Sequence, residues 1–245
     1  MTALAALTRA EARQIYRSPA SVIFAVGLPL LAIIVMAVIP ATRVPVEAFG
    51  GLSVIVAFTA PIVMFSVTVT GVMSMPQTLG MHRESGFLRR LRTTPVPPSS
   101  VLGASVAVHA VLGLTVATAI VLITVVAGGR PPEQPFLLAF VVVLMNAVFL
   151  AIGAVLCALI PNVKVLAGVG NVVVVVMWFT AGLWIPRAAF PDWAQTLTDL
   201  TPGGASAELL HTAIAGGDGS WQDVVVCLVW IALSVGIAVR VFRWE

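Results

Sequence analysis

The chain has 245 residues, of which 60% are hydrophobic and only 9% are charged, and its formal net charge is +3. A soluble domain keeps about a quarter of its residues charged, so this composition excludes a water-soluble globular protein and predicts a polytopic membrane protein. The arginines are scattered over many segments instead of gathering on one basic domain, which argues against nucleic acid as a partner.

The N-terminal residues 3–18 form the first predicted element. Leu4, Leu7 and Ile15 fall on one helical face, and three arginines spaced four apart share the opposite face. These arginines are Arg9, Arg13 and Arg17. The pattern predicts an interfacial helix whose basic face meets lipid headgroups and water. A solvated N-terminal tail is the alternative.

Six apolar segments follow, each long enough to supply the ~20 residues that a helix needs to cross a bilayer core. Prolines and glycines mark most of the joints between them. The segments are approximately 20–40, 52–75, 101–127, 136–160, 164–185 and 222–242. We therefore expect an all-α fold, with a single transmembrane domain over 1–245 that has six spans.

The distribution of Lys and Arg over alternate loops predicts the orientation, because cytoplasmic loops are enriched in these residues. Ten lie on the side that holds both chain ends, and three lie on the other side. The ten are Arg9, Arg13, Arg17, Arg83, Arg89, Arg90, Arg92, Lys164, Arg240 and Arg243, and the three are Arg43, Arg130 and Arg187. We expect a multi-pass protein of the plasma membrane with both termini in the cytoplasm.

A basic segment at residues 77–92 separates the second and third apolar segments. As a helix along the inner membrane surface it carries an apolar stripe flanked by arginines. The stripe is Phe87, Leu88 and Leu91, and the arginines are Arg83, Arg89, Arg90 and Arg92. Glu84 lies inside the stripe, so we expect it to pair with Arg9, Arg13 or Arg17 of the N-terminal helix. Enrichment of cytoplasmic loops in basic residues alone is the simpler alternative.

The outer loop before the last apolar segment is the longest loop. Pro191 and Pro202 suit the first turns of two short helices, near 190–200 and 203–215. We expect a helical hairpin over about 190–215 that lies on the outer leaflet or dips into it as a re-entrant element.

The run RESGFLRRLRTTPVPP resembles the central motif of type-2 ABC transporter permeases, in which a Glu and a Gly precede LRRLRTTP and a further proline. Glu84 and Gly86 stand in the first two positions, and Phe87 departs from the Thr that the family often has. The rest of the motif matches at Leu88, Arg89, Arg90, Leu91, Arg92, Thr93, Thr94, Pro95 and Pro97. The fragment GLWIP at 182–186 is also similar to the family's pattern after its fifth span.

This resemblance implies a membrane subunit of an exporter close in style to the daunorubicin-resistance permeases, acting in multidrug export or antibiotic resistance. It implies a dimer of permease subunits, homodimeric or with a paralogue, that pairs with a separate ATPase subunit. Residues 77–92 would then be the coupling helix that docks on the ATPase, with Arg9, Arg13 and Arg17 at its joint to the spans. ATP and Mg would bind the partner, and this chain would bind no cofactor.

The motifs of several enzyme classes are absent from the sequence. No P-loop pattern GxxxxGK[ST] occurs, so the chain is not expected to hydrolyse ATP itself. His82, His109 and His211 lie in separate elements and lack the spacing of metal ligands, so we expect no metal site.

Aromatic, Met and polar residues of the second and fifth segments, which the resemblance assigns to the exit path, are candidate pathway residues. They suit an amphipathic cargo because they offer dispersion contacts without a fixed charge. The candidates are Phe58, Met64, Phe65, Thr68, Asn171, Met177 and Phe179. Ordinary core or lipid-facing packing is the alternative for these side chains.

Export of a hydrophobic or amphipathic small molecule, such as a drug, antibiotic or lipid, is the function that these observations favour. Two alternatives stay open. The cargo could be a lipid-linked glycan or another envelope precursor, although the spans look too apolar for a polar conduit. The chain could also be a membrane scaffold or immunity protein that docks cytosolic partners without transporting anything.

Overall fold

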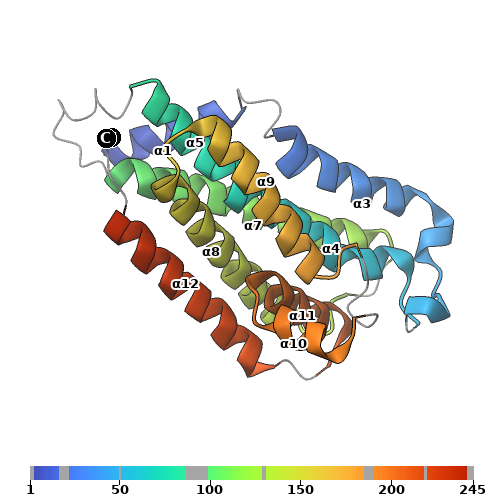
Figure 1. Cartoon of the computed structure of the whole chain (residues 1–245). Coiled ribbons are helices and arrows are strands. Elements are labelled where there is room, and N and C mark those ends of the chain that lie inside the picture. Colours follow the sequence, from blue (N-terminus) through green and yellow to red (C-terminus); the bar gives the residue numbers. More distant parts are fainter. Residues whose placement is uncertain are drawn as a thin grey trace.

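The computed structural model describes residues 3–16, 22–49, 51–86, 99–128, 131–184, 190–217 and 220–241. This part of the chain is helical and contains no strand, with one isolated β-bridge between Pro45 and Ser53. The all-α prediction is therefore confirmed. The long helices lie alongside one another, as Figure 1 shows.

The helices follow the order of the predicted segments. The N-terminal helix α1 spans Ala3–Tyr16, and the first apolar segment forms η1 (Ile23–Gly27) and α3 (Leu28–Val38). Two 3-10 turns follow, η2 (Pro40–Arg43) and η3 (Glu47–Phe49). The remaining helical elements are α4 (Val54–Thr68), η4 (Val69–Ser74), α5 (Met75–Glu84), α7 (Ser99–Val126), α8 (Pro135–Leu159), α9 (Val163–Thr180), α10 (Asp192–Asp199), α11 (Pro202–Ala215) and α12 (Trp221–Val241).

Within the described ranges, five helices are long and apolar enough to cross a membrane. The predicted first span, 20–40, is represented by the apolar helix Ile23–Val38, which is shorter than the ~20 residues that a crossing needs. Residues 17–21 lie outside the described part. The structure thus supports five spans by length and composition, and the sixth remains a prediction.

The second predicted span continues far beyond its expected end. Helices α4, η4 and α5 form one continuous helix, Val54–Glu84, of 31 residues. Residues 77–84 are therefore the end of this long helix and not the start of a separate surface helix. The π-helical segment η4 ends just before Pro76, where a proline without an N–H would disturb a regular α-helix. The helix stops at Ser85 and Gly86, whose φ is +67°, and residues 87–98 are outside the described part.

Helix α8 lies at the centre of the bundle, and its buried side chains include Met145, Val148 and Phe149. It crosses η4 at two glycines, Gly71 and Gly153, and a Cβ added at Gly71 would lie 2.7 Å from the backbone carbon of Phe149. A Cβ at Gly153 would collide with the carbonyl oxygen of Gly71. The two backbones can approach this closely only because neither residue has a side chain.

The helix ends divide the bundle into two ends. Helix α1, the last turn of α5 and the last turn of α12 lie at one end, and α10 and α11 lie at the other (Figure 1). Of the six described Lys and Arg residues, five belong to helices or helix ends at the first end. They are Arg9, Arg13, Arg83, Lys164 and Arg240, whereas Arg43 lies in η2. This charge asymmetry is what the sequence analysis used to predict orientation.

Helices α10 and α11 occupy the segment expected to form a hairpin. The hydroxyl oxygen of Thr201 accepts a hydrogen bond from the Gly204 N–H at 3.0 Å and so caps α11. A Cβ on Gly203 would meet the carbonyl of Met177, so α11 packs directly on the end of α9. On α10, Trp193, Leu197 and Leu200 share an exposed face.

Candidate functional site

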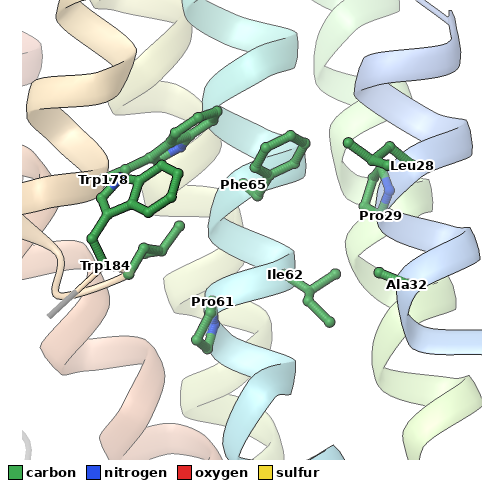
Figure 2. A pocket seen from close by; sticks show the side chains of 9 residues that line it. Leu28, Pro29, Ala32, Pro61, Ile62, Phe65, Trp178 and Trp184 are labelled. Carbon is green, nitrogen blue, oxygen red and sulfur yellow. The ribbon is translucent and has the colours of Figure 1, made fainter. Parts of the chain in front are cut away.

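An apolar groove of about 250 Å³ lies between α3, α4 and the end of α9 (Figure 2). None of its described lining residues carries a charge. The residues are Leu28, Pro29, Ala32, Pro61, Ile62, Phe65, Trp178, Leu183 and Trp184. Leu28 and Trp184 are exposed, so the groove is open at its rim. Such a surface can hold an apolar or aromatic ligand through dispersion and desolvation.

The wall of the groove is held in place by a contact between α4 and α9. The indole N–H of Trp178 donates to the hydroxyl oxygen of Thr68 at 2.8 Å, and the ring stacks on Phe65 with 4.6 Å between centroids. Thr68 donates in turn to the carbonyl of Met64 at 2.7 Å, so its lone pairs face the indole. The aromatic wall is therefore fixed in orientation before any ligand arrives.

The predicted pathway residues separate into three groups. Phe65 lines the groove and Thr68 supports it through Trp178. Met64 lies fully in the core, and Met177 packs against the core. The other three are exposed elsewhere, with Phe58 edge-on to Phe49 and Phe179 stacked on Phe190. These three are Phe58, Asn171 and Phe179.

Several groove residues were missed by sequence reasoning. Leu28, Pro29 and Ala32 come from the first apolar segment, which carries no polar or aromatic signal there. In the structure, the π-helical segment η1 lies directly before Leu28 and marks this stretch as a candidate site, because π-segments frequently accompany functional sites. Pro61, which marks the middle of α4, was the available clue in the sequence.

A second site lies where α1 meets the end of α5, and we call it the α1–α5 joint. Its centre is a pair between Glu11 and His82, 2.5 Å apart from Oε1 to Nε2. Both side chains are buried, Glu11 with 3% of its surface exposed. The joint is lined further by Leu7 and Gln14, which lie on the same helical face as Glu11.

The expected pairing of Glu84 with Arg9 or Arg13 does not appear in the described part of the chain, where both arginines are exposed. Arg17, the third expected partner, lies outside the described residues, so that pairing stays a prediction. Glu84 instead accepts a hydrogen bond at 3.4 Å from the backbone N–H of Val163, in the first turn of α9. A carboxylate there satisfies a free N–H and complements the helix dipole.

Arg83 also reaches the bundle. Its guanidinium donates to the carbonyl oxygen of Cys157 at 3.0 Å, close to the end of α8. The last turn of α5 is thus bound to α1 through His82, to α8 through Arg83 and to α9 through Glu84. The other residues expected to dock on a partner fall outside the described part of the chain. These are Phe87, Leu88, Arg89, Arg90, Leu91 and Arg92.

A fold of apolar helices long enough to span a bilayer, with an apolar groove between them, defines a polytopic membrane protein. The chain belongs to the ABC-2 type transporter family, which matches residues 2–213. It is 22% identical over 227 residues to "Putative transport permease YvfS" of Bacillus subtilis (strain 168), covering 91% of this chain and 90% of that protein. It is 23% identical over 226 residues to "Putative transport permease ycf38" of Porphyra purpurea, covering 91% of this chain and 77% of that protein. The family resemblance inferred from the sequence motif is confirmed.

Proposed function

We propose that this chain is the membrane-spanning subunit of an ATP-driven exporter, and that it moves a hydrophobic or amphipathic small molecule out across the plasma membrane. Family membership supports a transport subunit. The observation that carries the cargo class is the groove between α3, α4 and α9, whose described lining residues are all apolar or aromatic.

The lining argues against a strongly polar cargo. A glycan that entered the groove would leave hydroxyl groups without hydrogen-bond partners, which costs ~1–3 kcal/mol for each group. A flat or branched apolar group would instead bury its surface against Phe65, Trp178 and Trp184. A drug-like molecule or an acyl chain therefore suits this groove better than a lipid-linked glycan.

The contacts of α5 suggest how a partner would drive the groove. A separate ATPase subunit, which binds ATP and Mg, would push on the segment 85–98 at the end of α5. Because α4, η4 and α5 are one helix, a displacement at Glu84 reaches Phe65 and Thr68 without crossing a loop. A second permease subunit would complete the assembly, with both termini in the cytoplasm, where the basic end of the bundle belongs by the positive-inside rule.

The test measures ATP hydrolysis by this chain co-purified with the ATPase encoded nearest to it, in lipid nanodiscs. Amphipathic drugs, lipids and a lipid-linked glycan are titrated in turn. We expect stimulation by a neutral amphipathic compound, and loss of that stimulation in Trp178→Ala. Trp221→Ala is the matched control, since Trp221 is 72% exposed at the start of α12 and lies outside the groove.

Two outcomes would overturn the proposal. Stimulation by the glycan and by no apolar compound would make the groove irrelevant to cargo choice. A stable complex whose ATP turnover is the same with every compound, and whose Trp178→Ala variant behaves like wild type, would favour a scaffold or immunity protein.

A further inference from the structure

We propose that a cavity between α1 and α5 binds a primary ammonium group, and that the source of this group is the headgroup of an ethanolamine phospholipid. The cavity has a volume of about 310 Å³ and lies inside the α1–α5 joint. It shares no lining residue with the apolar groove. The proposal is therefore independent of the cargo.

Among the described residues, the polar part of the cavity lining is rich in hydrogen-bond acceptors and contains no Lys or Arg. Glu11, Gln14, His82 and Ser85 supply it. Only one oxygen of the buried Glu11 carboxylate is bound to His82. The other, Oε2, is buried without a hydrogen-bond partner in the described part of the chain. A buried carboxylate oxygen without a donor is costly, and an ammonium group brings both three N–H donors and the opposite charge.

The apolar part of the lining shows that the ligand carries more than a charge. Leu7, Ala10 and Met81 form this part, and Met81 is half exposed at the rim. A hydrated metal ion gains nothing from such walls. An ammonium on a short carbon stem, as in ethanolamine or an alkylamine, places its methylene groups against them.

The position of the cavity favours a lipid over a soluble amine. Leu7 packs against the apolar cluster that contains Val101, in the first turn of α7, and α1 contacts α7, so α1 lies level with the start of that span. Glu84 lies at the first turn of α9. The ends of apolar spans mark the boundary of the hydrocarbon core, which is the level at which lipid headgroups lie.

Arg13 supplies the second half of the headgroup recognition. Arg13 does not line the cavity, but it is exposed and stands three residues after Ala10, which does, so we place its flexible side chain beside the Ala10 edge of the rim when a headgroup is bound. A phosphate next to the ammonium would bind this guanidinium through charge-assisted hydrogen bonds. A choline headgroup lacks N–H donors, and a glycerol headgroup lacks the positive charge. The site therefore selects ethanolamine over both.

The experiment follows thermal unfolding of the purified full-length chain in a neutral detergent. The ligands are lysophosphatidylethanolamine, lysophosphatidylcholine, lysophosphatidylglycerol and dodecylammonium, each at the same micellar fraction. We expect the ethanolamine lipid to raise the Tm by about 2–4 °C more than the choline or glycerol lipids, as a ligand present well above its Kd does for a chain of this size. The difference should vanish in Glu11→Gln and persist in Glu47→Gln, whose carboxylate is exposed and lies outside the cavity.

Each shift is measured against the variant's own melting temperature, so a general loss of stability in Glu11→Gln does not hide the result. If that variant does not fold, Gln14→Leu takes its place.

Arg13→Gln distinguishes a lipid headgroup from a simple amine as the source of the ammonium group. This variant should lower the Tm shift for the ethanolamine lipid to the value for dodecylammonium. An ethanolamine effect that equals the choline effect, or survives in Glu11→Gln, would overturn the site. A full effect of dodecylammonium, with no change for the lipid in Arg13→Gln, would overturn the lipid as the source. If none of the ligands shifts the Tm, the lipid is overturned as the source as well, and a lysine of a partner protein is favoured as the ammonium group.

Discussion

The groove and the α1–α5 joint are built by opposite means. The described lining of the groove is apolar or aromatic, and its wall is fixed by a hydrogen bond between Trp178 and Thr68 and by stacking of Trp178 on Phe65. The joint buries a carboxylate and an imidazole, and polar contacts tie its helix end to three neighbours. Polar contacts have directional geometry, so the joint holds its helices in fixed relative positions, whereas the groove can accept ligands of several shapes. The following variants test this contrast, in order of expected effect.

The largest effect is expected at the crossing that lies between the two regions. Gly153→Ala places a Cβ against the Gly71 carbonyl, and two backbones cannot move apart without repacking α8. We expect a loss of about 3 kcal/mol or more, at the upper end of overpacking costs. The measurement is thermal unfolding in detergent, compared with Gly236→Ala, where no atom lies within 4 Å of the added Cβ. Equal stability of the two variants would contradict the close crossing.

The second variant series breaks the joint. His82→Leu leaves the Glu11 carboxylate buried without its partner, which should cost about 3 kcal/mol. The double variant Glu11→Leu/His82→Leu should lose less than the sum of the single losses, by about 1–3 kcal/mol, because the residues are in contact. Additive losses would mean that the pair does not form. His211→Leu, at an exposed histidine of α11, is the control and should change stability little.

The third variant separates position from stability. Glu84→Ala removes the acceptor for Val163 N–H, an exposed contact whose loss should change fold stability by less than about 0.5 kcal/mol. Transport per ATP hydrolysed should nevertheless fall about fivefold or more, while the ATPase still binds, because the link between α5 and α9 is lost. Transport equal to wild type would exclude this link from coupling. Glu47→Ala is the matched control.

The fourth variant acts on the groove. Thr68→Val leaves the indole N–H of Trp178 without its acceptor and should cost about 1 kcal/mol. Tryptophan emission should change as the ring loses its fixed orientation. Thr118→Val is the control, since Thr118 is exposed and donates only to a carbonyl of its own helix. An unchanged emission spectrum would mean that stacking on Phe65 alone positions the ring.

The smallest effect on the fold is expected at Arg9. This side chain is exposed on α1, and Arg9→Gln should change the free energy of unfolding by less than about 0.5 kcal/mol. Association of an anionic lipid with the detergent-solubilised chain should weaken by about 1 kcal/mol, roughly fivefold, at low salt. A large loss of stability would show that Arg9 belongs to the joint after all.

The spans were the part of the fold that the sequence predicted well. The predicted segments 101–127, 136–160 and 222–242 lie within one or two residues of α7, α8 and α12, because prolines and glycines bound these apolar runs. Between 75 and 86 the structure differs from the expected end of the second span at 75 and start of a separate helix at 77. The π-helical η4 ends just before Pro76, and the helix continues through the proline to Glu84.

The contacts between helices were beyond sequence reasoning. A helical wheel places Glu84 among apolar residues but does not show which helix lies opposite it. Glu11 stands between arginines on a basic helix, so its sequence context does not mark it as buried, and its separation of 71 residues from His82 hides their contact. The groove combines three segments that are distant in the sequence. Of the predicted pathway residues, only Phe65 lines it, and Thr68 supports it through Trp178.

The continuous helix Val54–Glu84 has a mechanical consequence. Its 31 residues measure about 46 Å, well beyond the ~30 Å of a bilayer core, and Gly71 divides it into arms of about 25 and 20 Å. If the glycine crossing acts as a fulcrum, a tilt of about 5° displaces the two ends by about 2 Å in opposite directions. A push that moves the basic end inward would then draw the outer end away from its neighbours. The helix would then work as a lever, and the position of the glycine crossing along it would set how far each end moves.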